Sequence, residues 1–343
     1  MNKRTSFNTH TYLTAQIAKI ASVVNSSSDR IYIEFGGKVI QDKHSSRVLP
    51  GYHENAKLKI IKKICQLGSH GESNTDSVFI VSAADILRGR IRGDFQTTYD
   101  QETLRTLTEL NKSGVTIRNV AITLMPKGKK IPRIIKKLMN NLDDLQIRTH
   151  LFNTVSNYLP QKELFHELSA NPFINSDKKI FLVLSPGGGS GKFGVCLNQL
   201  YHEMTRNYAP RYLKFETFPV YNLPIDHPIN LAYMAASADF YDMVMKDNRR
   251  KSTASYNRDL ENYELLRYLA KQFPRQGKHL RKITSATSMG INMLTKGILD
   301  HQTIQKESAA EIARRLIRYK FEVAAGKEDP RVLDRVRNIL AML

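Results

Sequence analysis

The sequence predicts an α/β fold of the doubly wound type, with mostly parallel sheets in two Rossmann-like or P-loop-like units and a helical C-terminal segment. Three observations predict it. Apolar strands alternate with amphipathic helices, one strand runs into a glycine-rich turn that opens a helix, and the chain beyond residue 230 is mostly helical in pattern. With 343 residues and 41% apolar content, the chain can bury a large core, and its size favours two domains over one.

The first predicted unit covers residues 1–170. It begins with a helix over residues 11–24 and an apolar strand over 30–35 that ends at Gly36-Gly37, before a loop over 38–50. Helices over 55–66, 101–112 and 131–140 then alternate with strands over 77–83, 118–124 and 146–151. This order predicts a parallel sheet with helices on its faces.

The second predicted unit covers residues 171–305, and C-terminal helices occupy 306–343. The composition turns polar around Pro172, which indicates either a domain boundary near residue 170 or a pseudo-boundary inside one continuous sheet. A strand over 179–184, a helix over 193–204 and a strand over 212–216 follow. The second unit therefore repeats the strand and helix order of the first.

The turn between the strand over 179–184 and the next helix predicts a phosphate site. Its glycines allow backbone N–H groups to face an anion, the helix adds its positive end, and Lys192 adds a full charge. The residues expected to hold the phosphate of a nucleotide cofactor are Ser185, Gly187, Gly188, Gly189, Ser190, Gly191 and Lys192.

This turn departs from the P-loop pattern at two positions. Pro186 stands where the first glycine belongs, and Phe193 stands where the Mg²⁺-binding hydroxyl belongs. The alternative is a structural turn with a solvated lysine. Four glycines among residues 187–191 argue against it, because each costs roughly 0.5–1 kcal/mol of backbone entropy.

The formal net charge of +20 calls for an anionic partner. Basic residues are scattered along the chain and are not interleaved with aromatic residues, which favours pockets for phosphorylated ligands over direct nucleic-acid recognition. Cys65 and Cys196 have neither disulfide-framework nor zinc-site spacing. The absence of a long apolar run and of a signal-peptide pattern favours a cytoplasmic protein with no membrane partner.

A second group of candidate residues follows the glycine turn. Glu216 ends the strand over 212–216, so it is expected at the carboxyl edge of the sheet as a metal ligand or proton acceptor, or else in an edge salt bridge. Asp239 and Asp242 lie three residues apart, on one face of a predicted helix, and could bind Mg²⁺. In Tyr256-Asn-Arg-Asp259, the arginine, Arg258, could clamp a phosphate beside the carboxylate of Asp259, and Asn257 could cap a helix and contact substrate.

The first unit carries a separate polar set, which comes from the ends of two strands and should therefore meet at one sheet edge. Lys38, Arg47 and Arg90 suit an anionic acceptor substrate, with Asp94 beside them. His44 could shuttle a proton, although a lone histidine more often forms loop hydrogen bonds.

Several long strings resemble a bacterial family, domain of unknown function 1846, and they span nearly the whole chain: Ile33-Glu-Phe-Gly-Gly-Lys38, His44-Ser-Ser-Arg-Val-Leu-Pro-Gly51, Thr98-Tyr-Asp-Gln-Glu-Thr103, Lys214-Phe-Glu-Thr-Phe-Pro219, His227-Pro-Ile-Asn-Leu-Ala-Tyr233 and Tyr256-Asn-Arg-Asp259. The resemblance implies a fold but no settled activity. It also implies longer relatives with a further C-terminal α/β domain. Where the family carries a carboxylate in its Ser-Pro-Thr-Asp motif, this chain has Ser288, which implies altered activity if that carboxylate is catalytic.

These observations together favour an ATP- or GTP-dependent phosphotransferase or ligase that uses Mg²⁺ and acts on a small anionic metabolite. The alternative is a protein that binds a nucleotide or another phosphorylated ligand without turnover, which Phe193 and Ser288 favour. A third hypothesis, carried by the charge alone, is a basic accessory protein that binds nucleic acid. A chain shorter than its relatives could also expose an apolar face and form a homodimer.

Overall fold

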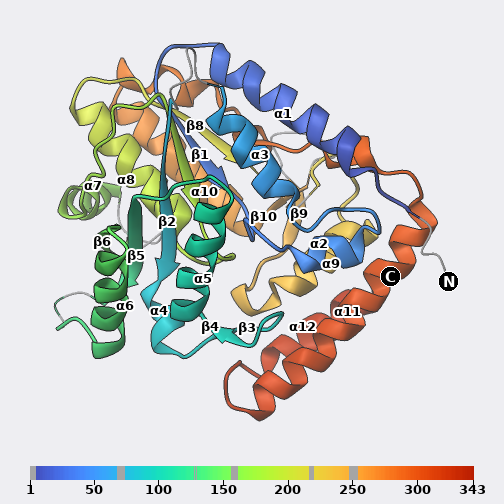
Figure 1. Cartoon of the computed structure of the whole chain (residues 1–343). Helices are drawn as coiled ribbons and strands as arrows, with labels where there is room; N and C mark the ends of the chain where they lie inside the picture. Colours follow the sequence, from blue (N-terminus) through green and yellow to red (C-terminus); the bar gives the residue numbers. More distant parts are fainter. Residues whose placement is uncertain are drawn as a thin grey trace.

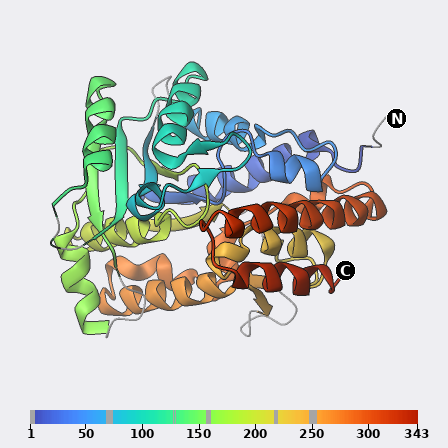
Figure 2. The same ribbon diagram turned by 90° about the horizontal axis from the view of Figure 1, so that it is seen from below.

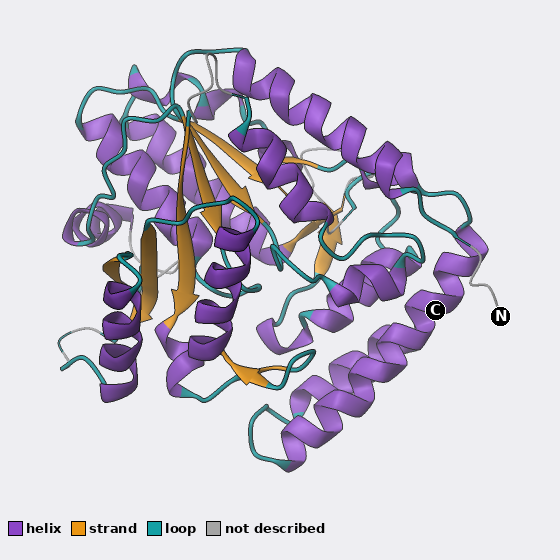
Figure 3. Cartoon of the chain, in the orientation of Figure 1, coloured by secondary structure: helices purple, strands orange, loops and turns teal. Residues whose placement is uncertain are grey.

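A seven-stranded parallel sheet forms the centre of the protein (Figures 1 and 3). The computed structural model describes residues 5–67, 74–126, 128, 130–155, 161–215, 220–246 and 254–343. The sheet order is β11-β8-β1-β7-β2-β5-β6, and every neighbouring pair is parallel. The strands are β1 (Ile31–Phe35), β2 (Thr75–Ser82), β5 (Asn119–Met125), β6 (Arg148–Asn153), β7 (Ile180–Leu184), β8 (Arg211–Phe215) and β11 (Gly290–Ile291).

Helices cover both faces of this sheet, which confirms the predicted doubly wound α/β fold (Figure 2). Alternate side chains of β1 divide between two apolar clusters: Ile31 and Ile33 pack on one face, and Tyr32 packs on the other. The first face carries α1 (Thr9–Asn25), α3 (Ala56–Cys65), α5 (Tyr99–Lys112) and α6 (Arg133–Asp144), and the second carries α7 (Gln161–Ala170), α8 (Lys192–Thr205) and α10 (Asn257–Gln272).

The chain leaves the two strands β7 and β2, which are neighbours, in opposite directions. From β7 it passes through α8 to β8, and from β2 it passes to β5 at the other side of the sheet. In open parallel sheets, the crevice at the carboxyl ends of two such strands is where ligands bind. The glycine-rich turn follows β7, so the fold places it at this crevice.

The division of the chain near residue 170 remains a prediction. Strands from either side of it pair in the same sheet, because β7 lies between β1 and β2. Both apolar clusters also draw residues from both predicted units. A division near residue 170 would therefore run through one continuous sheet.

The C-terminal segment is helical, as expected, and packs beside the carboxyl edge of the sheet (Figure 1). The long helix α11 (His301–Ala324) contacts α12 (Arg331–Leu340), α9 (Pro228–Ala236) and α2 (Lys43–Val48). The other elements in the described residues are α4 (Ala83–Leu87), the antiparallel pairs β3 (Ile91–Arg92) with β4 (Thr97–Thr98) and β9 (Val244–Lys246) with β10 (Ala254–Tyr256), and the 3₁₀ turns η1 (Ala238–Phe240), η2 (Gln276–Lys278), η3 (Leu280–Lys282), η4 (Thr287–Met289) and η5 (Leu294–Gly297).

Candidate functional site

A cavity of about 600 Å³ lies at the carboxyl ends of the parallel strands. Nine lysine and arginine residues line it, against five aspartate and glutamate residues. The basic residues are Lys38, Lys57, Arg90, Arg92, Lys192, Lys214, Arg258, Arg315 and Arg318, and the acidic residues are Glu34, Asp42, Asp239, Asp242 and Asp259. A cavity of this size accommodates a small molecule, and its charge favours an anionic one.

The glycine turn lies on the wall of this cavity between β7 and α8. Gly189 and Gly191 have φ angles of +70° and +81°, in the left-handed region that favours glycine. A Cβ atom at Gly189 would lie 2.2 Å from the ring of Phe240, and one at Gly191 would lie 3.0 Å from Thr123 Oγ1. Thr123 also donates a hydrogen bond of 2.6 Å to the carbonyl of Ser190. Close contacts with Phe240 and Thr123 therefore require glycine at these two positions, whether or not a ligand binds at the turn.

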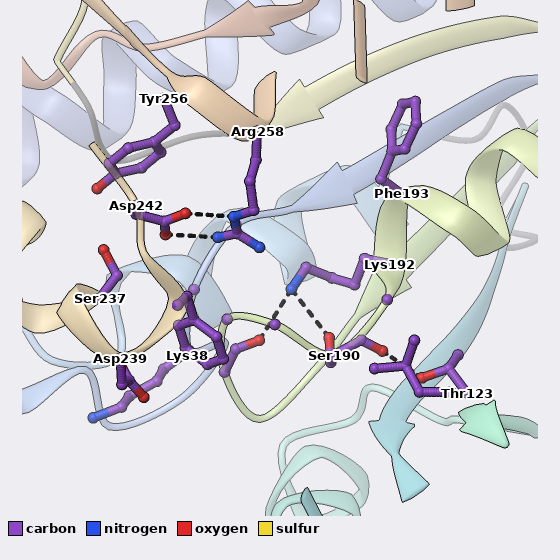
Figure 4. Close-up of a pocket in the computed structure, with 18 of the residues that line it drawn as sticks. Lys38, Thr123, Ser190, Lys192, Phe193, Ser237, Asp239, Asp242, Tyr256 and Arg258 are labelled. Atoms are coloured by element: carbon purple, nitrogen blue, oxygen red, sulfur yellow. Dashed lines mark hydrogen bonds and ion pairs between the residues drawn. The ribbon is translucent and has the colours of Figure 1, made fainter. Parts of the chain in front are cut away.

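Lys192, the first residue of α8, folds back over the turn (Figure 4). Its Nζ donates to Ser185 Oγ at 2.8 Å, to the Gly187 carbonyl at 3.0 Å and to Ser190 Oγ at 3.3 Å. The residue is 6% exposed, so Lys192 is not a solvated side chain. The ammonium group lies where the cavity meets the turn.

Phe193 points away from the turn (Figure 4). Its ring packs edge-on against Tyr212, with centroids 6.0 Å apart, in the apolar cluster under α8. The position at which a P-loop carries its Mg²⁺-binding hydroxyl is therefore occupied by a core aromatic residue.

Arg258 and Asp259 lie in the first turn of α10 and line the cavity, and each is held by an opposite charge. Arg258 forms a two-pronged contact with Asp242, in which Nη2 lies 2.6 Å from Oδ2 (Figure 4). Asp259 pairs with Lys214 from β8. Asn257 lies outside the cavity lining and accepts a hydrogen bond of 2.9 Å from the Met243 N–H.

Asp239 and Asp242 do not share a helix face, contrary to the prediction. The 3₁₀ turn η1 ends at Phe240, and Tyr241 takes a left-handed conformation with φ of +57°, which redirects the chain between them. Asp239 pairs with Arg90 and accepts a hydrogen bond of 3.0 Å from the Tyr319 hydroxyl. In the described part of the chain, no cluster of three or more histidine, cysteine, aspartate or glutamate residues could hold a metal ion. Glu216, the other predicted metal ligand, lies outside the described residues.

The predicted acceptor residues of the first unit form one network with α11. Lys38 Nζ lies 2.5 Å from Asp94 Oδ2, and Arg47 lies 3.3 Å from the same carboxylate. Burial lowers the pKa of Lys38 to about 8, although Asp94 opposes this shift. Burial would raise the pKa of Asp94, but Lys38 and Arg47 hold it well below its usual range. Lys38 and Arg90 line the cavity, whereas Arg47 and Asp94 are not among its lining residues.

Glu311 of α11 joins this network and was not singled out by the sequence. Its carboxylate lies 2.7 Å from His44 Nδ1, 2.8 Å from Arg47 Nε and 2.7 Å from Arg314. Burial opposes its ionisation, but these contacts lower its pKa well below the usual range. The helical spacing of Glu311 from Arg314 and Arg315 was a signal, but that pattern is also typical of a solvated helix face.

Glu34 at the end of β1 is another cavity residue that the sequence did not reveal. It is buried and accepts a hydrogen bond of 2.6 Å from the Tyr212 hydroxyl. A lone glutamate in an apolar strand just before Gly36-Gly37 was the available signal.

Acid is expected to destabilise the fold through His44. Burial, with a contribution from Arg315, lowers the pKa of His44 from 6.5 to about 4 against the opposing effects of Glu311 and Asp42. Between these pH values the unfolded chain binds the proton and the folded chain does not, so the free energy of unfolding decreases as pH falls. His44→Asn should reduce this slope by up to roughly 1.4 kcal/mol per pH unit, measured by urea unfolding from pH 7 to pH 4.

The pKa of His227 is also lowered to about 4. Because this residue is present in both chains, its contribution to the pH dependence cancels when the two slopes are compared. The carboxylates of Asp94 and Glu311, whose pKa values are lowered, reduce the free energy of unfolding only when the pH falls below their ordinary pKa values near 4. Their effect is therefore confined to the acid end of this pH range. Equal slopes in the two chains would contradict the expected contribution of His44.

Among the described residues, no helix has both the length and the apolar composition needed to cross a membrane.

Comparison with known proteins shows similarity to proteins named UPF0371. It is 36% identical to the UPF0371 protein of Clostridioides difficile (strain 630) over 99% of this chain and 66% of that protein. It is 35% identical to a UPF0371 protein of Clostridium botulinum (strain Alaska E43 / Type E3) and 34% identical to one of Clostridium tetani, in each case over 97% of this chain and 65% of the relative. The chain thus spans just under two thirds of the length of these relatives. It belongs to the family described as domain of unknown function DUF1846, N-terminal, which matches residues 5–343.

Proposed function

We propose that this chain binds a phosphorylated small molecule, with a phosphate group on the glycine turn. The observation that carries the proposal is the position of the turn. It stands at the carboxyl end of the central strand β7, begins the 14-residue helix α8, and opens into a cavity with nine basic and five acidic lining residues. Backbone N–H groups, the positive end of α8 and Lys192 all favour negative charge there.

The present contacts of Lys192 are compatible with such a ligand. Its hydrogen-bond acceptors include two hydroxyl groups and one carbonyl of the turn itself, and these three are neutral. A phosphate oxygen is a stronger acceptor for an ammonium group than a neutral oxygen. A phosphate on the turn would therefore compete favourably with these three acceptors for the ammonium group.

Transfer of the phosphoryl group from ATP or GTP to a small anionic acceptor is the second candidate function. It is favoured by a second set of polar groups, including Lys38 and His44, that lines the same cavity. The core position of Phe193 and the arginine partners of Asp239 and Asp242 favour binding without turnover. In the phosphotransferase proposal, Mg²⁺ therefore enters with the triphosphate.

The test is thermal unfolding of the full chain with ATP, GTP and ADP, each with and without Mg²⁺, and with pyrophosphate and glucose 6-phosphate. A probe at about 100 times its dissociation constant should add roughly 2.7 kcal/mol of stability, which raises the midpoint by several degrees. Lys192→Ala should remove most of this shift, measured against the variant's own midpoint. Lys179→Ala is the matched control: Lys179 directly precedes β7, at the end of the strand opposite to the glycine turn, and its substitution should keep the shift.

The outcomes separate the candidates. A Lys192-dependent shift with a triphosphate supports the nucleotide and justifies a screen for acceptors. A shift with glucose 6-phosphate alone supports a phosphorylated metabolite and contradicts the phosphotransferase. A shift that survives in Lys192→Ala would place the ligand away from the turn.

A further inference from the structure

The imidazole of His44, on the wall of the cavity, has two charged contacts at Nδ1. This nitrogen lies 2.7 Å from Glu311 Oε1 and 3.4 Å from Arg315 Nη2, and all three residues are buried. Although burial opposes this shift, Glu311 is ionised, because its contacts with His44, Arg314 and Arg47 lower its pKa. An ionised carboxylate can only accept hydrogen bonds, and the contact with Glu311 is much shorter than the contact with Arg315, so the hydrogen of the neutral imidazole is assigned to Nδ1. The lone pair is then on Nε2.

This Nε2 atom is buried and has no hydrogen-bond partner among the described residues. A buried polar atom without a partner costs about 1–3 kcal/mol, so folded proteins rarely retain one. A histidine with only a structural role would be expected to have both nitrogens paired. His44 instead has one nitrogen fixed by a carboxylate and the other unpaired, and its ring packs edge-on against Tyr233 at 4.4 Å between centroids.

Charged groups on neighbouring elements influence the pKa of the His44 imidazole. Glu311 and Arg315 lie on α11, Asp42 precedes α2, and Arg47 contacts the same glutamate from α2. Burial keeps the imidazole neutral at pH 7, because its pKa is lowered to about 4. A phosphate bound in the same cavity adds negative charge, which favours the imidazolium and so makes Nε2 a stronger base in the loaded site.

We propose that His44 is the proton acceptor for a hydroxyl group of an acceptor molecule in the cavity, and that Glu311 is its positioning residue. This inference rests on the proposed phosphate site and names the reaction class for it, attack of an alcohol on the bound phosphoryl group. The O–H bond breaks and its proton moves to Nε2. The oxygen electron pair forms the new O–P bond, while the bond from phosphorus to the leaving oxygen breaks and that oxygen keeps its electrons.

The tautomer of His44 tests this inference without a ligand. In the full chain labelled with ¹⁵N-histidine, long-range ¹H–¹⁵N NMR at pH 7 should show His44 neutral, with its hydrogen on Nδ1. His44→Asn identifies the signals, and its side-chain amide can still donate to Glu311. Glu311→Gln should populate the Nε2–H form, because it removes the charge that fixes the tautomer. A purely structural role for Glu311 would leave the tautomer unchanged.

An imidazolium or an Nε2–H tautomer in the unmodified chain at pH 7 would overturn the inference. Glucose 6-phosphate and ATP with Mg²⁺ then provide the second readout, in which the Nε2 signal should move upon binding. Because the tautomer needs no ligand, its failure is distinct from failure of the phosphate site. If the expected tautomer is found but Lys192→Ala leaves the ligand-induced shift unchanged, the result would support the proposed role of His44 and contradict the phosphate site on the glycine turn.

Discussion

Glu311→Ala is expected to reduce the free energy of unfolding by about 3–5 kcal/mol, as removal of one member of a buried ion cluster does. The carboxylate is buried and contacts His44, Arg47, Arg314 and Arg315. Arg315 is itself buried, so the substitution leaves a cation in the interior without its nearest carboxylate. Urea unfolding at pH 7 measures the loss.

Glu322→Ala on the same helix is the matched control. Glu322 makes a single ion pair with Arg318, at 2.7 Å, and both side chains are partly exposed. Such a pair contributes about 0–1 kcal/mol. If the two glutamate substitutions destabilised the chain equally, the cluster around Glu311 would not have the role in stability that its geometry indicates.

Gly189→Ala is expected to have the second-largest effect. The left-handed backbone costs alanine roughly 1–2 kcal/mol, and the new Cβ would collide with the Phe240 ring at 2.2 Å. Phe240 has little room to move, because the guanidinium of Arg90 lies 4.2 Å from the centroid of its ring. The collision should add roughly 1–3 kcal/mol, which is typical of an overpacked site.

Two further variants, measured by urea unfolding, separate the cost of the left-handed backbone from the cost of the collision with Phe240. Gly326→Ala has a similar φ of +66° but no atom within 4 Å of the new Cβ, so it reports the backbone cost alone. In a Phe240→Ala background, the excess cost of Gly189→Ala should disappear. An excess that persists without the Phe240 ring would locate the strain elsewhere in the turn.

The sequence predicted the fold class because short apolar strands and amphipathic helices have distinct periods. It also predicted that loops after parallel strands would share one edge. Lys38, His44, Arg90, Lys192 and Arg258 do line one cavity, although they come from distant parts of the chain. Their roles remain predictions. The strand order was not predictable, since the five buried residues of β7 would suit any central position in the sheet.

The charge partners were beyond the reach of sequence patterns, because tertiary packing selects them. Nothing near His44 in the sequence indicates Glu311, and nothing near Arg258 indicates that Asp242 takes both prongs of its guanidinium. The expected helix face of Asp239 and Asp242 failed because Tyr241, between them, adopts a conformation that non-glycine residues rarely take. A single backbone dihedral thus separated two carboxylates that helical spacing had placed together.

The position of β7 also bears on how the protein is made. The ribosome releases β1 and β2 long before β7, yet these two strands contact each other only through β7. Until residue 184 has emerged, β1 has neither of its neighbours, because β8 follows β7 in the chain, and one edge of β2 is unpaired. Exposed edges of this kind are where chains pair wrongly with one another. The strand that carries the glycine turn therefore also joins β1 to β2, so the candidate site forms in the same step that connects the two parts of the sheet.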